Sequence, residues 1–234
     1  MDAVEQFWHR VSSPVPELPA AVLLTALAVA ALVVLSPVLW RPARGVVTLA
    51  HEGAHGLVAL LTGRRLAGIR LHSDTSGLTV SAGRPTGLGM VLTCAAGYLG
   101  PGLFGLAAAA LLAAGYAAGL LWALLGLLAL LLVQIRNWFG LWSVLATGAV
   151  VFAVTWWLPP AGQAAFAAVG TWFLLLAAPK TVLELQRSRR HRAAPDSDAD
   201  QLARLTHLPG ALWVGVLFLV DLGALLLGGW WLLG

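Results

Sequence analysis

The residues best suited to chemistry lie in one apolar segment, where His51, Glu52 and His55 form the pattern His-Glu-x-x-His. In a helix, residues i and i+4 lie one turn apart on the same face, so both imidazoles can bind one metal ion. Glu52 lies about 100° around the helix from His51 and can act as general base on a metal-bound water. Because ionisable side chains inside a hydrophobic helix are costly, they mark functional sites. The pattern therefore predicts a hydrolytic metal site.

Zinc is the metal that this pattern favours, because it accepts imidazole readily and keeps a water beside three protein ligands in catalytic sites. The pattern does not fix the third ligand. Asp221 lies within the last apolar run, at a depth comparable to that of His51. Asp198 opens a predicted amphipathic helix that would have to fold into the mouth of a helix bundle. Depth alone favours Asp221, and the residues leave both carboxylates open.

The composition indicates a membrane protein. The 234 residues are 59% hydrophobic and only 10% charged, with a mean hydropathy of +0.85. A soluble domain needs more charge to cover its surface, and the apolar runs are long enough to span a bilayer. We predict an all-α polytopic membrane protein with a single integral domain over residues 1–234. The lone Cys94 excludes an intrachain disulfide, and basic residues gathered in loops do not indicate nucleic-acid binding.

About seven transmembrane helices are expected to position the site. Their predicted ranges are 18–40, 45–63, 88–114, 117–133, 138–158, 164–178 and 209–234. The second span holds the metal motif, and the core of the site extends over about 45–210. Between the second and third spans, residues 67–72 and 78–81 flank a turn rich in Ser, Asp and Gly and predict a short cytoplasmic or re-entrant β-hairpin.

Two features could bind a substrate. An unpaired strand edge of the hairpin can pair with an extended peptide, which a helical substrate must become before its backbone is cut. Asn137, in the polar link before the fifth span, could hydrogen-bond a substrate backbone or an oxyanion. The alternative for Asn137 is an ordinary polar turn at the membrane surface.

Charge predicts the orientation in the membrane. Seven spans place twelve of the 14 Lys and Arg residues on one side and leave only Arg41 and Arg44 on the other. The positive-inside rule then puts the N-terminus, the hairpin and the loop 179–208 in the cytoplasm, with the C-terminus extracytoplasmic. The acidic residues and prolines before the first apolar run do not fit a secretory signal peptide. We expect a multi-pass protein of the cell membrane.

The sequence resembles the site-2 protease family, the M50 metallopeptidases, and more narrowly the compact M50B-like group of actinobacteria. The resemblance covers most of residues 45–210 and rests on the stretches 51–55, 62–65, 74–77, 96–101, 136–140 and 197–199. It implies an intramembrane zinc metalloendopeptidase that cuts a membrane protein substrate. In that reading His51 and His55 bind zinc, and Glu52 is the general base. The residues expected to bind substrate are Asn137 and Gly77 of the hairpin.

The resemblance also implies an aspartate as the third zinc ligand. Better-known members carry this residue in a Leu-Asp-Gly motif, which is absent here. The compact group has Ser-Asp-Ala before the last span, as in Ser197-Asp198-Ala199, so the resemblance favours Asp198 over Asp221. The alternative function is a catalytically inactive M50-like scaffold that binds a partner, and the missing Leu-Asp-Gly motif keeps this alternative open.

Overall fold

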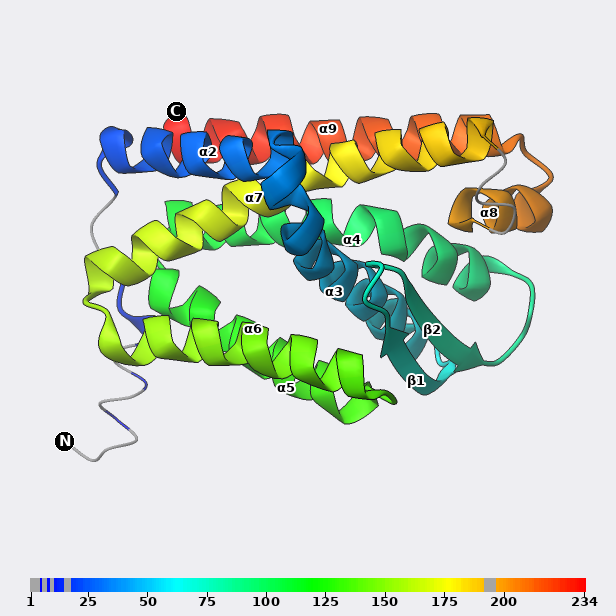
Figure 1. The fold of residues 1–234 in the computed structure, drawn as a ribbon, viewed down its shortest axis with the longest axis horizontal. Helices are drawn as coiled ribbons and strands as arrows, with labels where there is room; N and C mark the ends of the chain where they lie inside the picture. The colour runs from blue at the N-terminus through cyan, green and yellow to red at the C-terminus, as the bar shows by residue number, and fades with distance from the viewer. Residues whose placement is uncertain (1–4, 6–7, 9–10, 15–17, 192–196) are drawn as a thin grey trace.

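The computed structural model describes residues 5, 8, 11–14, 18–191 and 197–234, and it is a bundle of long helices with one small hairpin (Figure 1). The elements in chain order are α2 (Ala20–Leu35), α3 (Pro37–Leu61), β1 (Arg65–Leu71), β2 (Gly77–Ala82), α4 (Leu88–Ala113), α5 (Ala117–Gln134), α6 (Trp138–Trp157), α7 (Pro160–Arg190), α8 (Asp198–Thr206) and α9 (Gly210–Leu233). Most of the long helices run side by side, whereas α3 crosses them obliquely (Figure 1). The predicted all-α membrane fold with a hairpin after the second helix is confirmed.

The centre of the bundle is helix α4, which packs against α3, α7 and α9. Small residues make this packing possible, because they let helix backbones approach closely where lipid provides no hydrophobic drive. On α4 the buried small residues include Gly97, Gly100, Gly102, Gly105 and Ala109. The core is therefore held by close backbone approach, and it brings α3 and α7 to either side of one helix.

The first membrane-crossing element is bent. Helices α2 and α3 meet at Ser36 with an angle of 99° between them. Pro37, the first residue of α3, has no N–H and cannot continue the hydrogen-bond ladder of α2. The Lys180 ammonium of α7 satisfies one carbonyl at this break, because its Nζ lies 2.5 Å from the Val34 oxygen. The break is thus supported by another helix.

This bend changes the expected span count. The predicted loop at Arg41 and Pro42 lies inside α3, and the predicted first two spans are the two arms of the bent pair. The described residues provide five helices that are long and apolar enough to cross a membrane, namely α4, α5, α6, α7 and α9. They provide six spans if the bent pair crosses once, in place of the seven expected.

The polar segment after the sixth predicted span is largely helical. Helix α7 continues to Arg190, so the expected loop 179–208 begins as helix. The predicted amphipathic helix is confirmed as α8, which begins at Asp198 and buries Ala199 and Leu202. Residues 192–196 of this loop lie outside the described residues, as does Met1, whose side of the membrane was predicted.

The predicted hairpin is confirmed as β1 paired antiparallel with β2, with an irregular register between Leu66 and Gly68. The outer edge of β1 is covered by the link between α5 and α6. Ile69 pairs with Ile135 in a parallel bridge, and the Arg136 N–H donates to the Ile69 oxygen at 2.9 Å. Within the ranges that the structure describes, no third strand pairs with β2, so its outer edge is the free edge of the sheet.

Candidate metal centre

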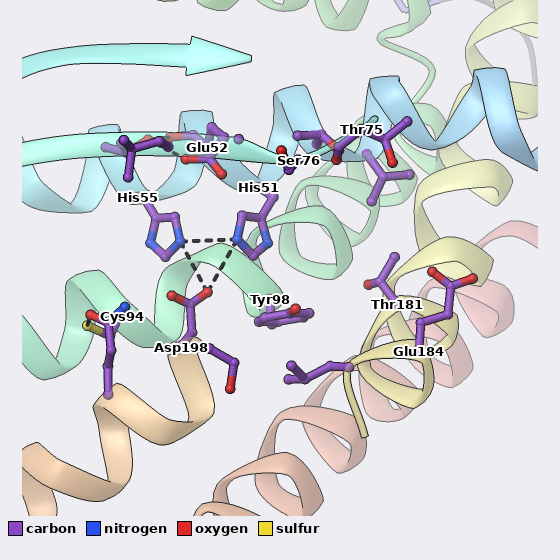
Figure 2. Close-up of a pocket in the computed structure, with 18 of the residues that line it drawn as sticks. His51, Glu52, His55, Thr75, Ser76, Cys94, Tyr98, Thr181, Glu184 and Asp198 are labelled. Atoms are coloured by element: carbon purple, nitrogen blue, oxygen red, sulfur yellow. Dashed lines mark hydrogen bonds and ion pairs between the residues drawn. The ribbon is translucent and has the colours of Figure 1, made fainter. Parts of the chain in front are cut away.

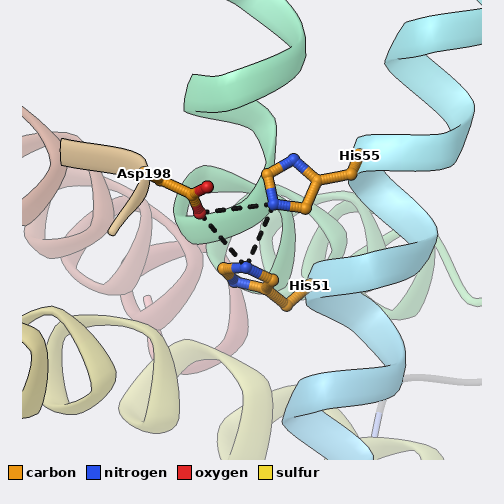
Figure 3. A group of neighbouring side chains, drawn as sticks. All are labelled: His51, His55 and Asp198. Atoms are coloured by element: carbon orange, nitrogen blue, oxygen red, sulfur yellow. Dashed lines mark hydrogen bonds and ion pairs between the residues drawn. The ribbon is translucent and has the colours of Figure 1, made fainter. Parts of the chain in front are cut away.

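Three side chains converge at the end of the bundle where the hairpin and α8 lie. Nε2 of His51 and Nε2 of His55 are 3.1 Å apart, and Oδ2 of Asp198 lies 3.3 Å from each (Figure 3). A tetrahedral zinc ion with bonds of about 2.0–2.1 Å would have ligand atoms about 3.3 Å apart. The three atoms therefore have the spacing of one face of a zinc tetrahedron, which leaves the fourth position for water.

The hydrogen bonds of His55 fix its tautomer. Its Nδ1 lies 2.6 Å from the backbone oxygen of Thr93, which can only accept a hydrogen bond, so Nδ1 carries the proton. Nε2 of the neutral ring then presents a lone pair toward His51 and Asp198. One proton cannot satisfy the lone pairs of two imidazoles and a carboxylate at a single point, whereas a cation can. A metal-binding histidine usually donates its other ring N–H to such a partner, here the backbone oxygen of Thr93.

Asp198 is held in place by the contacts of its own helix. The residue comes from the first turn of α8, which Asp200 ties to α7. Oδ1 of Asp200 accepts from Nε and Nη2 of Arg189 at 3.1 and 2.7 Å, and Oδ2 accepts from the Ser197 hydroxyl at 2.5 Å. This ion pair fixes the short helix that presents Asp198.

Glu52 is the third polar residue of the motif, and its carboxylate contacts the hairpin. Figure 2 shows it on the hairpin side of the two imidazoles, with Asp198 on the other side. The residue is only 5% exposed. Its Oε2 accepts a hydrogen bond of 2.6 Å from the Thr79 hydroxyl of β2. Gly77 leaves space for it, because a Cβ at that position would lie 2.5 Å from both Cγ and Oε1 of Glu52.

A cavity of about 740 Å³ opens in front of these residues, between the hairpin, α3, α4, α7 and α8. The free edge of β2 lines one wall through Gly77, Leu78, Thr79 and Ser81. The hairpin turn is tied down at the far end of this wall. Thr75 accepts hydrogen bonds from Thr48, at 2.8 Å, and from Arg44, which also bonds Glu184 of α7 at 3.1 Å. Arg44 thus links α3, α7 and the hairpin around the cavity.

The structure separates the two candidate third ligands. Asp198 lies within the metal-ligand group, whereas Asp221 is buried in α9 against Gly102 of α4. Asp221 is 1% exposed, and neither carboxylate oxygen has a hydrogen-bond partner among the described residues. It does not line the cavity. The sequence favoured Asp221 because its depth in the membrane is comparable to that of His51. Depth does not determine toward which neighbouring helix a side chain points.

The two predicted substrate residues have different surroundings. Gly77 lines the cavity beside Glu52. Asn137 does not line it, because both ends of its amide are engaged by the end of β1. Its Oδ1 accepts from the Leu71 N–H at 3.1 Å, and its Nδ2 donates to the Leu71 oxygen at 2.6 Å. Asn137 therefore pairs with β1 in the manner of a strand and supports the hairpin from behind.

Sequence reasoning missed three supporting residues. Thr79 and Thr93 hydrogen-bond Glu52 and His55 from segments far along the chain, and no local pattern marks them. Arg189 lies in the predicted loop 179–208 and pairs with Asp200 of the predicted amphipathic helix. The one signal for a contact with α7 is Asp200 itself, which lies on the face of the predicted amphipathic helix opposite the apolar Leu202.

Comparison with known proteins supports this picture. A family model described as Peptidase M50B-like matches residues 24–228, which is nearly the whole chain. No curated protein and no solved structure matches the chain. The family match covers His51, Glu52, His55, Asp198 and the hairpin.

Proposed function

The chain belongs to the Peptidase M50B-like family, and we propose that it is a zinc-dependent intramembrane endopeptidase that cuts a membrane protein in or near a transmembrane segment. The observation that carries the proposal is the triangle of His51, His55 and Asp198, whose edges of 3.1–3.3 Å fit zinc. The five or six spans make it a membrane protein, and we propose the cell membrane as its location.

The residues around the triangle fit the proposed hydrolysis. His51, His55 and Asp198 would hold zinc, which supplies a Lewis acid and lowers the pKa of a bound water. Glu52 accepts a proton from the attacking water and then delivers it to the amine that leaves. Thr93 keeps the lone pair of His55 directed at the site. The cavity of about 740 Å³ admits both the peptide and the water that the reaction consumes.

The free edge of β2 supports a substrate-binding role for the hairpin. Gly77, Leu78, Thr79 and Ser81 line the cavity on this edge, beside Glu52. An extended peptide that paired with β2 would have its backbone hydrogen bonds satisfied while it crossed the site. Gly77 is part of this edge, and Asn137 contributes by covering the opposite edge through Leu71. The substrate is therefore a segment that has lost its helical structure.

The bent pair supports an orientation in the membrane. If α2 and α3 cross the membrane once, the start of α2 and the end of α9 lie at the same end of the bundle, as Figure 1 shows. The opposite end carries Arg64, Arg65, Arg84, Arg136 and the arginines at the end of α7. The positive-inside rule places that end, with the hairpin and the metal centre, on the cytoplasmic side. This orientation keeps the C-terminus extracytoplasmic and moves the N-terminal side of α2 there as well.

The test uses the detergent-purified protein and a quenched fluorescent peptide with an apolar centre. We expect one zinc per chain in the wild type and in Glu52→Gln, with cleavage of the peptide reduced at least about 100-fold in the variant. His51→Ala should lose both zinc and cleavage. A Glu52→Gln variant that cleaves like the wild type would refute the mechanism. Wild-type protein that binds zinc but cuts neither this peptide nor any membrane protein of its host would leave the partner-binding scaffold as the function.

A further inference from the structure

The hydroxyl of Thr79 has two acceptors, and both belong to Glu52. It lies 2.6 Å from the carboxylate atom Oε2 and 3.2 Å from the backbone oxygen of the same residue. A hydroxyl has one proton, so it donates to one acceptor at a time, and the carboxylate oxygen at the shorter distance is the closer acceptor. Thr79 thus lies against both the side chain and the main chain of Glu52 and bonds chiefly to the side chain.

Steric confinement points the same way. Glu52 is 5% exposed and fills the space beside Gly77, two residues before Thr79 on β2. Residues i and i+2 of a strand face the same side, so Gly77 and Thr79 form one surface against the carboxylate. The glycine makes room for the side chain, and the threonine fixes its direction.

The geometry points to Thr79 as the positioning residue of Glu52, supplied by the same strand whose free edge we propose binds substrate. The inference rests on the proposed function. It deepens that function, because a peptide that pairs with β2 would contact the strand that orients the general base. Substrate binding and alignment of the base would then depend on one element, and Thr79 acts through Glu52 without contacting the reacting atoms.

The experiment replaces zinc with cobalt(II), whose visible spectrum reports on the ligands and on the hydrogen bonding of metal-bound water. The full-length protein is purified in detergent as wild type, Thr79→Val, Thr79→Ser and Glu52→Gln. Thr79→Val keeps the shape of the side chain and removes the hydroxyl. Thr79→Ser keeps the hydroxyl and removes the methyl group. Thr48→Val is the matched control, because Thr48 bonds the hairpin at Thr75 with a similar length, 2.8 Å, and forms no hydrogen bond with Glu52.

We expect all variants to bind cobalt within about threefold of the wild-type affinity. The spectrum of Thr79→Val should move toward that of Glu52→Gln, whereas Thr79→Ser and Thr48→Val should keep the wild-type bands. With zinc and the fluorescent peptide, Thr79→Val should lower kcat about tenfold and change KM less than about twofold, and Thr79→Ser should restore kcat.

Three results would overturn the inference. A wild-type spectrum in Thr79→Val would show that the hydroxyl does not position Glu52, while cobalt binding would leave the proposed function intact. A changed spectrum in Thr79→Ser would assign the effect to packing of the methyl group. Absence of cobalt binding in the wild type would refute the proposed function together with the inference. Thr79→Ala repeats the comparison if valine prevents folding.

Discussion

Gly97 lies directly against the two imidazoles: a Cβ at this position would be 2.3 Å from Nε2 of His55 and 2.6 Å from Nε2 of His51. Those atoms are the ones that would bind zinc, and the Gly97 backbone belongs to the buried face of α4. Real Cβ atoms do not approach other atoms this closely, so any side chain at residue 97 must displace the histidines. The close approach of α4 is thus a condition for the metal site.

We therefore expect Gly97→Ala to abolish stoichiometric zinc binding while the helices stay folded, because alanine is a better helix former than glycine. The measurement is zinc content by elemental analysis, with circular dichroism as the check on folding. Gly148→Ala on α6 is the matched control, since a Cβ there meets no atom within 4 Å. Full zinc occupancy in Gly97→Ala would contradict the placement of α4 against His51 and His55.

The identity of the third ligand can be tested with a pair of aspartate variants. Asp198→Ala should weaken zinc binding more than about 100-fold, because it removes an anionic ligand from the triangle. Asp221→Asn should keep one zinc per chain, because Asp221 packs against Gly102 away from the cavity. Competitive titration with a chelator gives both affinities. Zinc lost in Asp221→Asn and kept in Asp198→Ala would reverse the assignment.

The hairpin turn should depend on pH through Asp74. Its carboxylate accepts hydrogen bonds from the Ser76 hydroxyl at 2.6 Å and from the Ser76 N–H at 2.9 Å, and these bonds hold the pKa of Asp74 below its usual value. A carboxyl whose folded pKa is lowered stabilises the fold above its unfolded pKa. That contribution is lost as the pH falls through the folded pKa.

We expect the amide of Ser76 to be protected from hydrogen exchange at about pH 5.5 and to lose protection toward about pH 3, after correction for intrinsic exchange rates. Asp74→Ala should show the low protection at both values. Equal protection of the wild type across this range would argue against an ionised Asp74 as the partner of Ser76.

Membrane topology distinguishes one bent crossing from two separate spans. Single cysteines in a Cys94→Ser background can be labelled from outside intact cells. With one crossing, positions 115 and 159 should be labelled from outside and positions 74 and 136 should be protected. A residue of the first turn of α2, such as Ala21, should behave like position 115. Protection at Ala21 with labelling at position 115 would restore the seven-span arrangement.

Much of the fold could be predicted from hydropathy, because lipid requires every backbone group of a span to be bonded within a helix. The break at Ser36 was not visible in this way. Arg41 and Pro42 resemble a loop, yet they lie in α3, because Pro37 ends α2 first. The charge next to them, Arg44, is balanced by Glu184 on α7. A charge balanced by a residue on a distant helix cannot be recognised from the hydropathy of the neighbouring residues alone.

The candidate metal ligands were predictable to different degrees. His51 and His55 are four residues apart, which places both side chains on one face of a helix, so the local pattern was sufficient to predict them. Asp198 could be predicted only from the family resemblance. Nothing in the sequence around it shows that Leu202 of the same helix packs against Cys94 of α4 and so brings α8 to the site. Asn137 was expected at the substrate because polar residues between spans are conspicuous. It bonds instead to the backbone N–H and oxygen of Leu71, and no sequence pattern predicts such a contact.

The position of Asp198 on α8 also bears on how the protein is made. A ribosome delivers α3, with both histidines and Glu52, long before it delivers α8. Until that late segment emerges and Asp200 pairs with Arg189, the nascent chain has only two of the three candidate ligands. The proposed metal site therefore cannot form during synthesis before α8 has been made.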